Sequence, residues 1–295
     1  MKLSKSKKKK LIMLAFVMPA LIFYTAFVLL PASGGFWYSL TNWNGLNPTY
    51  KMVGLSNYVE ALTDDMYFIN SLLFTLKFVF FMVLLQNTIA LLLAVLVESR
   101  QKSKGLLRTI FFMPNMISMI IGGFIWMFIF TEVLPFIAAN TIFKFLDQSW
   151  IGNPNFSFYA ILIVSLWGGV GYIMLIYIAA LQGVPNNLKE AARIDGANDF
   201  QIFRHITLPM ILPAITVGIF VTLNSSFKVF DAVYALTGGG PGRSTQVIAL
   251  NIFEEAFSMN NRYGYASAKA MILFTIVALI TVVQLSLMKK REVEL

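Results

Sequence analysis

EAARIDGANDFQIFRHITLPMILP, residues 190–213, is a charged, amphipathic segment that lies between two long apolar runs. The chain of 295 residues is 58% hydrophobic and only 13% charged, with a mean hydropathy of +0.72. Soluble domains carry about one quarter charged residues, so a single soluble core of this length cannot bury so much apolar surface. The bilayer must therefore solvate much of the chain, and the quoted segment is predicted to connect two membrane helices.

Six apolar runs reach or exceed the roughly 20 residues that cross the hydrocarbon core. They cover residues 11–31, 69–97, 106–130, 157–182, 206–227 and 267–288. The predicted fold class is an all-α polytopic membrane protein with six transmembrane helices. The first run follows a Lys-rich start, as in a signal peptide, but it exceeds the roughly 7–15 residues of a typical signal-peptide core. We therefore expect an uncleaved first helix.

The distribution of basic residues predicts the orientation, because cytoplasmic loops carry an excess of Lys and Arg. Sixteen of the 23 basic residues fall on one side of the six-helix arrangement. They are Lys2, Lys5, Lys7, Lys8, Lys9, Lys10, Arg100, Lys102, Lys104, Arg108, Lys189, Arg193, Arg204, Lys289, Lys290 and Arg291. Both termini and the segment 190–213 are therefore predicted to be cytoplasmic. The net charge of +9 reflects this topology and contact with anionic lipid, so we expect no nucleic-acid partner.

The sequence lacks the residues that several kinds of catalytic, metal-binding and nucleotide-binding site need. The chain has no Cys and a single His, His205, which excludes disulfides, thiol nucleophiles and metal clusters built on Cys or His. No Gly-Lys-Ser or Gly-Lys-Thr phosphate loop is present, so we expect ATP to bind to a partner and no cofactor to bind here. The sequence predicts no catalytic residue and no metal site.

The six runs also contain no Asp or Glu, since Glu98, Glu132 and Asp231 fall at or beyond their ends. Ion-coupled carriers usually need a carboxylate or His inside the membrane to bind the coupling ion. Lys77 and Lys269 lie near the outer ends of their runs, where their side chains can reach water. Energy is therefore expected to come from a partner, unless transport is passive.

Local signals predict a helix–turn–helix in the connecting segment. Asn187 and Glu190 have capping-box spacing, with Asn in place of Ser or Thr, at the start of a first short helix. Gly196 then favours a turn, because glycine adopts backbone conformations that other residues resist. Asn198 and Gln201 repeat the capping pattern for a second short helix. The pair of helices would lie along the membrane and present charges outward.

The same segment resembles the EAA loop of bacterial ABC importer permeases. The matching positions are Glu190, Ala191, Ala192, Asp195, Gly196, Ala197, Phe203, Ile206, Leu208, Pro209 and Pro213. The resemblance implies the type I ABC importer permease fold and a coupling loop, residues 185–206, that sits in a cleft of an ATPase. It implies that Glu190 faces the ATPase and that Gly196 forms the bend, with the small residues Ala191, Ala192 and Ala197 allowing the loop to seat. A solvated cap is the alternative role for Glu190 alone.

Further stretches resemble carbohydrate-importing permeases. They are LTGGGP at 236–241, Ser244-Thr245, Ala256-Phe257, Tyr263-Gly264-Ala266, VGLSNY at 53–58, Met113-Pro114 and Trp126. Val53 departs from the Phe of the family pattern. The resemblance implies the first maltose-type membrane subunit, because the chain stops soon after Lys289 and lacks the extended tail of the second type.

Seven polar or aromatic residues inside the runs are candidates for contact with a sugar. Sugars are bound by neutral hydrogen-bonding groups and aromatic faces, which a water-filled membrane cavity can hold. The candidates are Gln86, Asn87, Trp167, Tyr172, Asn224, Ser225 and Ser226. Interhelical hydrogen bonds and aromatic packing are the alternative role of each.

The prediction is a sugar importer subunit in the bacterial inner membrane. Three parts are expected: residues 1–68 with the first helix and outer loop, a permease core over 69–288, and a cytoplasmic tail over 289–295. The resemblance implies a second homologous permease, two ATPase subunits and an extracytoplasmic sugar-binding protein as partners. An autonomous ion-coupled carrier or facilitator, and a membrane scaffold, are the alternatives.

Overall fold

A computed structural model describes residues 5–100, 102–258 and 261–289. The described residues are almost entirely helical, with no β-strand and one isolated antiparallel bridge between Thr41 and Met52. The chain forms two compact units, Met1–Asp65 with Ile252–Leu273, and Met66–Asn251 with Phe274–Leu295. Lys2, Lys290 and Arg291, which the orientation prediction uses, lie outside the described residues.

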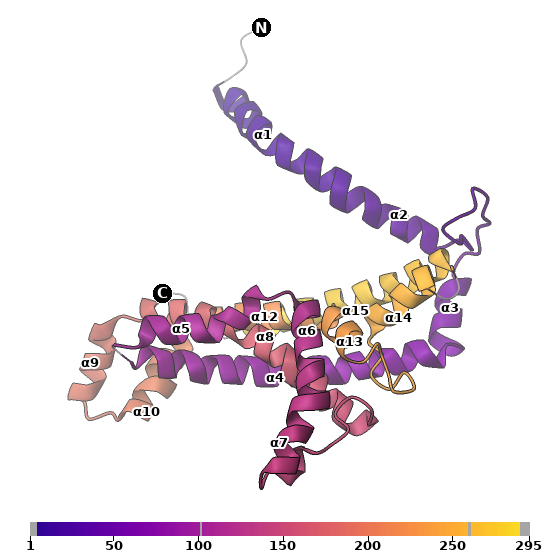
Figure 1. The fold of residues 1–295 in the computed structure, drawn as a ribbon. Helices are drawn as coiled ribbons and strands as arrows, with labels where there is room; N and C mark the ends of the chain where they lie inside the picture. The colour runs from indigo at the N-terminus through magenta and orange to yellow at the C-terminus, as the bar shows by residue number, and fades with distance from the viewer. Residues whose placement is uncertain (1–4, 101, 259–260, 290–295) are drawn as a thin grey trace. The chain divides into compact units, whose positions relative to one another are not determined.

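The first unit begins with the helices α1 and α2, which follow one another and lead into a structured loop (Figure 1). Its elements are α1 (Lys5–Tyr24), a π-helical turn over Thr25–Leu29, α2 (Leu30–Ser39), α3 (Ser56–Thr63), a second π-helical turn over Glu254–Ser258 and the start of α15 (Tyr263–Lys289). The Asn57 side chain fixes the loop after α2 by donating to the carbonyls of Ser39 and Thr41, each at 2.8 Å. A Cβ at Gly264 would overlap the Thr41 carbonyl, so only glycine allows this close approach.

Two sets of ion pairs hold α3 and Asp65 to the start of α15 within this unit, one of them exposed and the other buried. Arg262 forms a bidentate pair with Glu60 at 2.8 and 2.7 Å, and this hydrogen bonding raises the pKa of Arg262. Lys269 is fully buried and lies 2.7 Å from Asp65 and 3.1 Å from Glu255. The expectation that Lys269 reaches water is therefore wrong, because two carboxylates stabilise its charge inside the protein.

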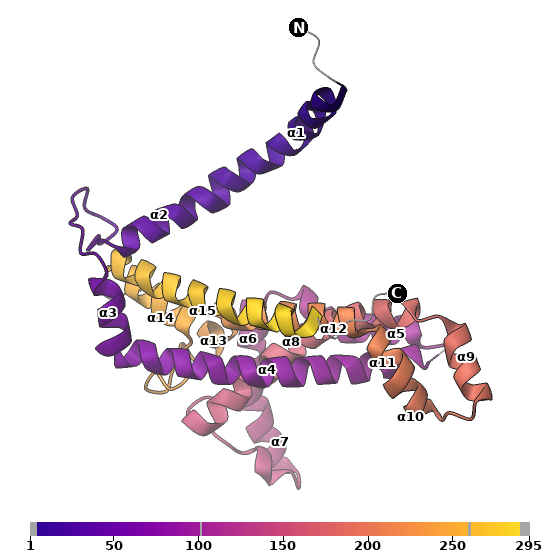
Figure 2. The same cartoon turned by 180° about the vertical axis from the view of Figure 1, so that it is seen from behind.

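The second unit is built around two long helices. Its elements are α4 (Met66–Glu98), α5 (Lys104–Phe112), α6 (Met119–Phe128), α7 (Leu134–Asn140), α8 (Pro154–Gly183), α9 (Asn186–Ile194), α10 (Asp199–Ile202), α11 (Leu208–Met210), α12 (Leu212–Phe227), α13 (Asp231–Leu236), α14 (Ile248–Phe253, which ends in the first unit) and the C-terminal part of α15. α8 runs alongside α4, with α9 and α10 at one end of the pair (Figure 1, and Figure 2 from behind).

Small residues bring the helices of the second unit together. Ala90 and Ala94 of α4 are fully buried, and a Cβ at Gly171 of α8 would overlap the carbonyl of Phe111. Lipid is as apolar as a leucine side chain, so close backbone approach and interhelical hydrogen bonds must supply much of the attraction between membrane helices. These positions explain why α8 packs so closely against α4 and α5.

The predicted membrane spans are confirmed in number and corrected in detail. Five helices are long and apolar enough to cross a membrane, and a sixth span results if the bent pair Asp199–Met210 and Leu212–Phe227 counts as one. The runs 69–97, 157–182 and 267–288 fall inside α4, α8 and α15. The first span is shifted to Met13–Ser39.

The third run is not one helix. α5 ends at Phe112, a 3₁₀ turn follows over Met113–Met116, and the span runs from Met119 to Asn140. Pro114 lacks the N–H that a continuing α-helix needs, which explains the break. Glu132 consequently lies inside a span, so the expectation of six runs free of carboxylates is wrong.

The fifth run is bent rather than straight. Its two helices meet at 67° around Ile211, whose backbone angles (φ −92°, ψ 2°) leave the α-helical region. Pro209 and Pro213 stand at the first turns of α11 and α12, positions that suit new helices rather than a continuous one. The fifth span therefore begins with a bend at Ile211, which lies near the end of the connecting segment 190–213.

Candidate coupling loop and transport cavity

The connecting segment folds as the predicted helix–turn–helix, with one correction at its start. α9 begins at Asn186, immediately after Pro185, and no side chain caps it. The capping box of Asn187 with Glu190 is therefore wrong: the Asn187 side chain instead accepts from the N–H of Leu188 at 3.0 Å. The Pro185 conformation (φ −60°, ψ 131°) starts the helix without help from a side chain.

The turn and the second cap are confirmed. Gly196 has φ +83° and no neighbouring atom lies within 4 Å of a Cβ built on it, so glycine is required by backbone conformation alone. Asn198 accepts from the Gln201 N–H at 2.9 Å, and the Asn198 N–H donates to the Gln201 side chain at 2.8 Å. These two contacts complete a capping box that fixes α10 against the turn.

The loop presents a mixed surface. Glu190, Ala191, Asp195 and Gly196 are exposed, and Ala192 and Ala197 are half-buried. The two most exposed large apolar side chains of the loop are Ile194, at 87% exposure, and Phe200, at 68%. The sequence analysis did not single out these two for contact with a partner, although exposed apolar groups beside charges are typical of interaction sites.

Glu98 ties three helices together behind the loop. Its carboxylate, at the end of α4, pairs with Lys104 and with Arg108 of α5, the latter at 3.1 Å. The Gln182 amide, near the end of α8, lies 3.4 Å from both Glu98 oxygens. The ends of α4 and α8 and the helix α5 are therefore joined at Glu98. The sequence analysis looked for charges inside the apolar runs and did not predict this contact.

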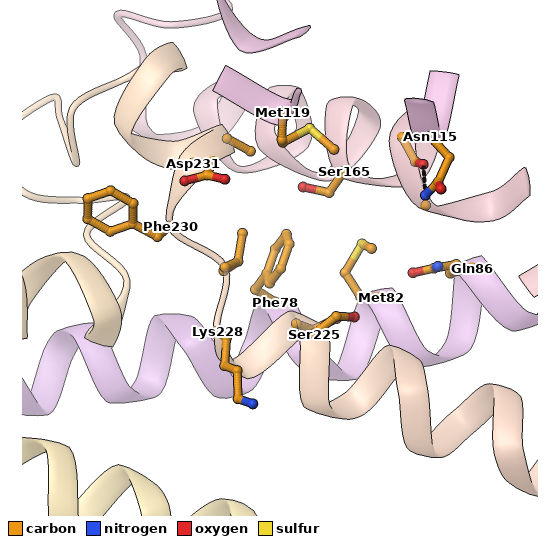
Figure 3. Close-up of a pocket in the computed structure, with 15 residues that line it drawn as sticks. Phe78, Met82, Gln86, Asn115, Met119, Ser165, Ser225, Lys228, Phe230 and Asp231 are labelled. Atoms are coloured by element: carbon orange, nitrogen blue, oxygen red, sulfur yellow. Dashed lines mark hydrogen bonds between the residues drawn. The ribbon is translucent and has the colours of Figure 1, made fainter. Parts of the chain in front are cut away.

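A cavity of about 280 Å³ opens between α4, α6, α8 and the end of α12 (Figure 3). Its lining residues are Phe78, Met82, Gln86, Asn115, Met119, Ser165, Gly168, Gly169, Ser225, Ser226, Lys228, Val229, Phe230, Asp231 and Ala232. Figure 3 shows Met119 and Ser165 on one side of the cavity and Ser225 on the opposite side. The size is close to the lower end of the range for small-molecule sites.

Neutral polar groups share the lining of this cavity with apolar side chains, such as Phe78 and Met82, and with the charged Lys228 and Asp231. The hydroxyls of Ser165 and Ser226 are buried and have no hydrogen-bond partner within the described structure. The Gln86 amide would lie 2.7 Å from a Cβ at Gly169, so that glycine makes room for it. A buried hydroxyl without a partner costs free energy, which a ligand with hydroxyl groups would recover.

The structure brings together three of the seven predicted sugar-contact residues. Gln86, Ser225 and Ser226 line the cavity. Asn87 instead bonds to Thr222 and Tyr177, and Asn224 donates to its own helix at Phe220. Trp167 stacks edge-on against Trp126, and Tyr172 is 44% exposed outside the cavity lining.

The chain matches the family of binding-protein-dependent transport system inner membrane components over residues 86–292. It belongs to this family. The probable starch degradation products transport system permease protein of Thermoanaerobacterium thermosulfurigenes is 43% identical to it, over 95% of this chain and 94% of the relative. The multiple sugar-binding transport system permease protein of Streptococcus mutans is 35% identical, over 94% and 95% of the two chains.

A solved structure shows the same fold. The crystal structure of a bacterial alginate ABC transporter in complex with an alginate pentasaccharide-bound periplasmic protein contains a chain that matches with a TM-score of 0.80. The match covers 95% of this chain and 94% of that chain, at 21% identity. The predicted permease fold and inner-membrane location are thereby confirmed, and the family leaves the alternatives of an autonomous carrier and a scaffold without support.

Four polar or charged residues of the permease cavity were missed by the sequence analysis, and Ser165 is one of them, a serine inside the apolar run 157–182. Asn115, whose amide donates to the Gly168 carbonyl at 3.2 Å, is a polar residue inside an apolar run, and that signal could have identified it. Lys228 and Asp231 follow the end of α12 at Phe227, where the predicted run 206–227 also ends, and the candidates for sugar contact were taken only from inside the runs.

Proposed function

We propose that this chain is the membrane-spanning permease subunit of an ATP-driven sugar importer. A second homologous permease would complete the pore, two cytoplasmic ATPase subunits would drive it, and an extracytoplasmic sugar-binding protein would deliver the solute. Support comes from the family and from the sugar transport systems that name its relatives.

The observation that carries the substrate class is the pair of buried, unpartnered hydroxyls of Ser165 and Ser226 in a cavity lined by amides and small residues. A polyhydroxylated solute can both donate to and accept from each serine and from Gln86. Phe78 and Met82 supply apolar surface for the C–H face of a sugar ring. Neutral oligosaccharides fit this lining better than an inorganic ion, which would need a cluster of charged or oxygen ligands.

The coupling role rests on the helix–turn–helix. Glu190 would contact the ATPase, Gly196 would set the bend, and Ala191, Ala192 and Ala197 would let the loop seat in the ATPase cleft, with Asp195 beside the turn. ATP would bind to the partner subunits and no cofactor to this chain. The chain would change no covalent bond; its three parts would be an outer region (1–68), a permease core (69–288) and a tail (289–295).

The test is reconstitution of the complete transporter in proteoliposomes with maltotriose, maltohexaose, raffinose and diacetylchitobiose as solutes. We expect ATP-dependent uptake of at least one sugar, and maltohexaose is the first choice because of the 43% identical relative. Ser165→Ala and Ser226→Ala should raise the KM for uptake about three- to tenfold each without lowering thermal stability, because no internal hydrogen bond is lost.

Ser71→Ala is the matched control, since Ser71 is equally buried but donates to the Phe68 carbonyl at 2.8 Å. It should lower stability slightly and leave the KM unchanged. Absence of uptake for all four sugars would contradict the proposed function. A KM that does not respond to either cavity serine would instead move the sugar site elsewhere.

A further inference from the structure

A second polar pocket lies in the first unit, on the loop that follows α2. Its volume is about 410 Å³, and it is lined only by Asn42, Asn44, Asn47, Thr49, Tyr50 and Lys51. Five of the six side chains are neutral hydrogen-bonding groups. The proposed transport cycle does not use this pocket, which belongs to an outer loop in the predicted orientation.

The loop that forms the pocket is rigidly built. Asn42 accepts from the Lys51 N–H at 2.7 Å, and the Asn42 N–H donates to the Lys51 carbonyl at 3.1 Å. The Asn44 side-chain oxygen accepts from the N–H groups of Leu46 and Asn47 at 3.1 and 2.9 Å. A loop held in this way is preorganised, so a ligand would not have to order it.

In these hydrogen bonds the side-chain oxygens of Asn42 and Asn44 accept. Their NH₂ groups donate to no partner among the described residues. The side chains of Asn47 and Thr49 likewise make no internal hydrogen bond in the described structure. The pocket therefore offers to the outside two amides that are held in place, those of Asn42 and Asn44, together with the Asn47 amide and the Thr49 hydroxyl. Each is the type of group that binds a sugar hydroxyl.

Aromatic side chains frame the pocket. Tyr50 lines it at 41% exposure, and its hydroxyl accepts from the indole N–H of Trp37 at 3.4 Å. Trp37 is itself 52% exposed, while Tyr38 stacks on Trp43 at 4.2 Å beneath the loop. Exposed aromatic faces beside amide groups can hold the apolar face of a sugar ring while the amides bind its hydroxyls.

We infer that this pocket is an outer binding subsite for the same sugar that the cavity transports, an inference that rests on the proposed function. Lys51 is the only cation among six lining residues, whereas phosphate or lipid headgroup sites gather several Arg or Lys side chains. The subsite would hold one end of an oligosaccharide outside the pore. In the predicted topology the solute reaches this loop before it reaches the cavity.

The test uses substitutions that keep the loop intact. Asn42→Asp and Asn44→Asp retain the accepting oxygens that hold the loop and replace the outward NH₂ donors with a charged carboxylate oxygen that can only accept. Thr49→Val removes a hydroxyl at nearly constant shape. Thr63→Val is the matched control, an exposed threonine on α3 whose hydroxyl donates to the Val59 carbonyl at 2.9 Å and lies outside the pocket lining.

Sugar contact is measured by saturation-transfer NMR on the complete transporter in lipid nanodiscs, without the extracytoplasmic binding protein. The probes are those of the four sugars that the proteoliposome assay shows to be transported. The background carries Ser165→Ala and Ser226→Ala, which weaken sugar contact in the cavity, so that the outer pocket contributes a larger share of the signal. Each pocket substitution should weaken the apparent affinity about three- to tenfold, and Thr63→Val should leave it unchanged.

Unchanged sugar contact in all three pocket variants would overturn the subsite while leaving the proposed transport function standing. The subsite would also be wrong if the variants weaken only the affinity for the binding protein, since the pocket would then be a protein contact. Failure of every sugar to be transported at all would refute the proposed function itself, and the inference with it.

Discussion

Removal of the Lys269 charge should destabilise the part of the first unit that contains α3 and Asp65. The Lys269 side chain has no exposed surface, and its partners Asp65 and Glu255 are only 16% and 12% exposed. Lys269→Met preserves most of the side-chain volume but leaves the two carboxylates without their shared cation. Removing one member of a buried ion pair costs about 3–5 kcal/mol, because the remaining charge stays desolvated.

The cost should be concentrated in the segment that Asp65 anchors, which includes α3. Each 1.4 kcal/mol changes an equilibrium constant tenfold, so amide hydrogen exchange in α3 should accelerate by about two to four orders of magnitude. The measurement is exchange followed by mass spectrometry on the transporter in nanodiscs. Exchange in the middle of α8, in the other unit, should not change.

Two further variants make the result decisive. Lys269→Met combined with Asp65→Asn and Glu255→Gln should restore slow exchange, because a neutral cluster leaves no unpaired charge. Arg193→Met breaks an exposed pair with Asp199, whose side chains are 61% and 89% accessible, and should change the stability by less than about 1 kcal/mol. Wild-type exchange in Lys269→Met, or no recovery in the triple variant, would refute the argument.

Three further predictions concern topology, energy source and coupling. A cysteine at Ser103 or Asn198 should be shielded from an impermeant thiol reagent in intact cells, and one at Ser244 should react; labelling of Asn198 from outside would reverse the orientation. Uptake should survive collapse of the proton gradient while ATP is maintained, and its immediate loss would contradict the importer. Gly196→Val strains a left-handed residue by about 1–2 kcal/mol, and together with Glu190→Ala it should abolish most transport and ATPase retention in purified complexes. Normal transport in that double variant would make the loop a mere connection.

Local signals in the sequence predicted the turn and the second cap of the connecting segment, but not the start of its first helix, where the Asn187 capping box is absent. The Gly196 turn and the capping box of Asn198 depend on residues within four positions of one another, and both are present. Average hydropathy, in contrast, does not register where a helix breaks. The run 106–130 stays apolar through Pro114, so its division into α5 and α6 required attention to the missing N–H rather than to the mean.

Features that depend on distant residues could not be predicted in the same way. Gln86 and Asn87 are neighbours on α4, yet one faces the cavity and the other bonds to Tyr177, because successive helical residues point about 100° apart. Lys269 lies near the end of an apolar run, which favours an exposed side chain, and only the fold shows that Asp65 and Glu255 reach it. Neither outcome is encoded in a short window of sequence.

The loop lies at one end of both α8 and α12, whereas the cavity is formed by the middle of α8 and by the other end of α12. From Gly168 in the cavity, α8 continues without a break to Gly183, about 22 Å at the rise of an α-helix, and α9 follows almost at once. On the other side of the loop, α12 spans a similar length from Leu212 to Ser226, but it meets the loop through the 67° bend. The loop is therefore joined to one cavity wall through the extended residues Val184 and Pro185, and to the opposite wall through the bend at Ile211. The two walls carry Ser165 and Ser226, so unequal motion of the walls would change the distance between these hydroxyls; under the proposed function, this change would link loop movement to sugar release.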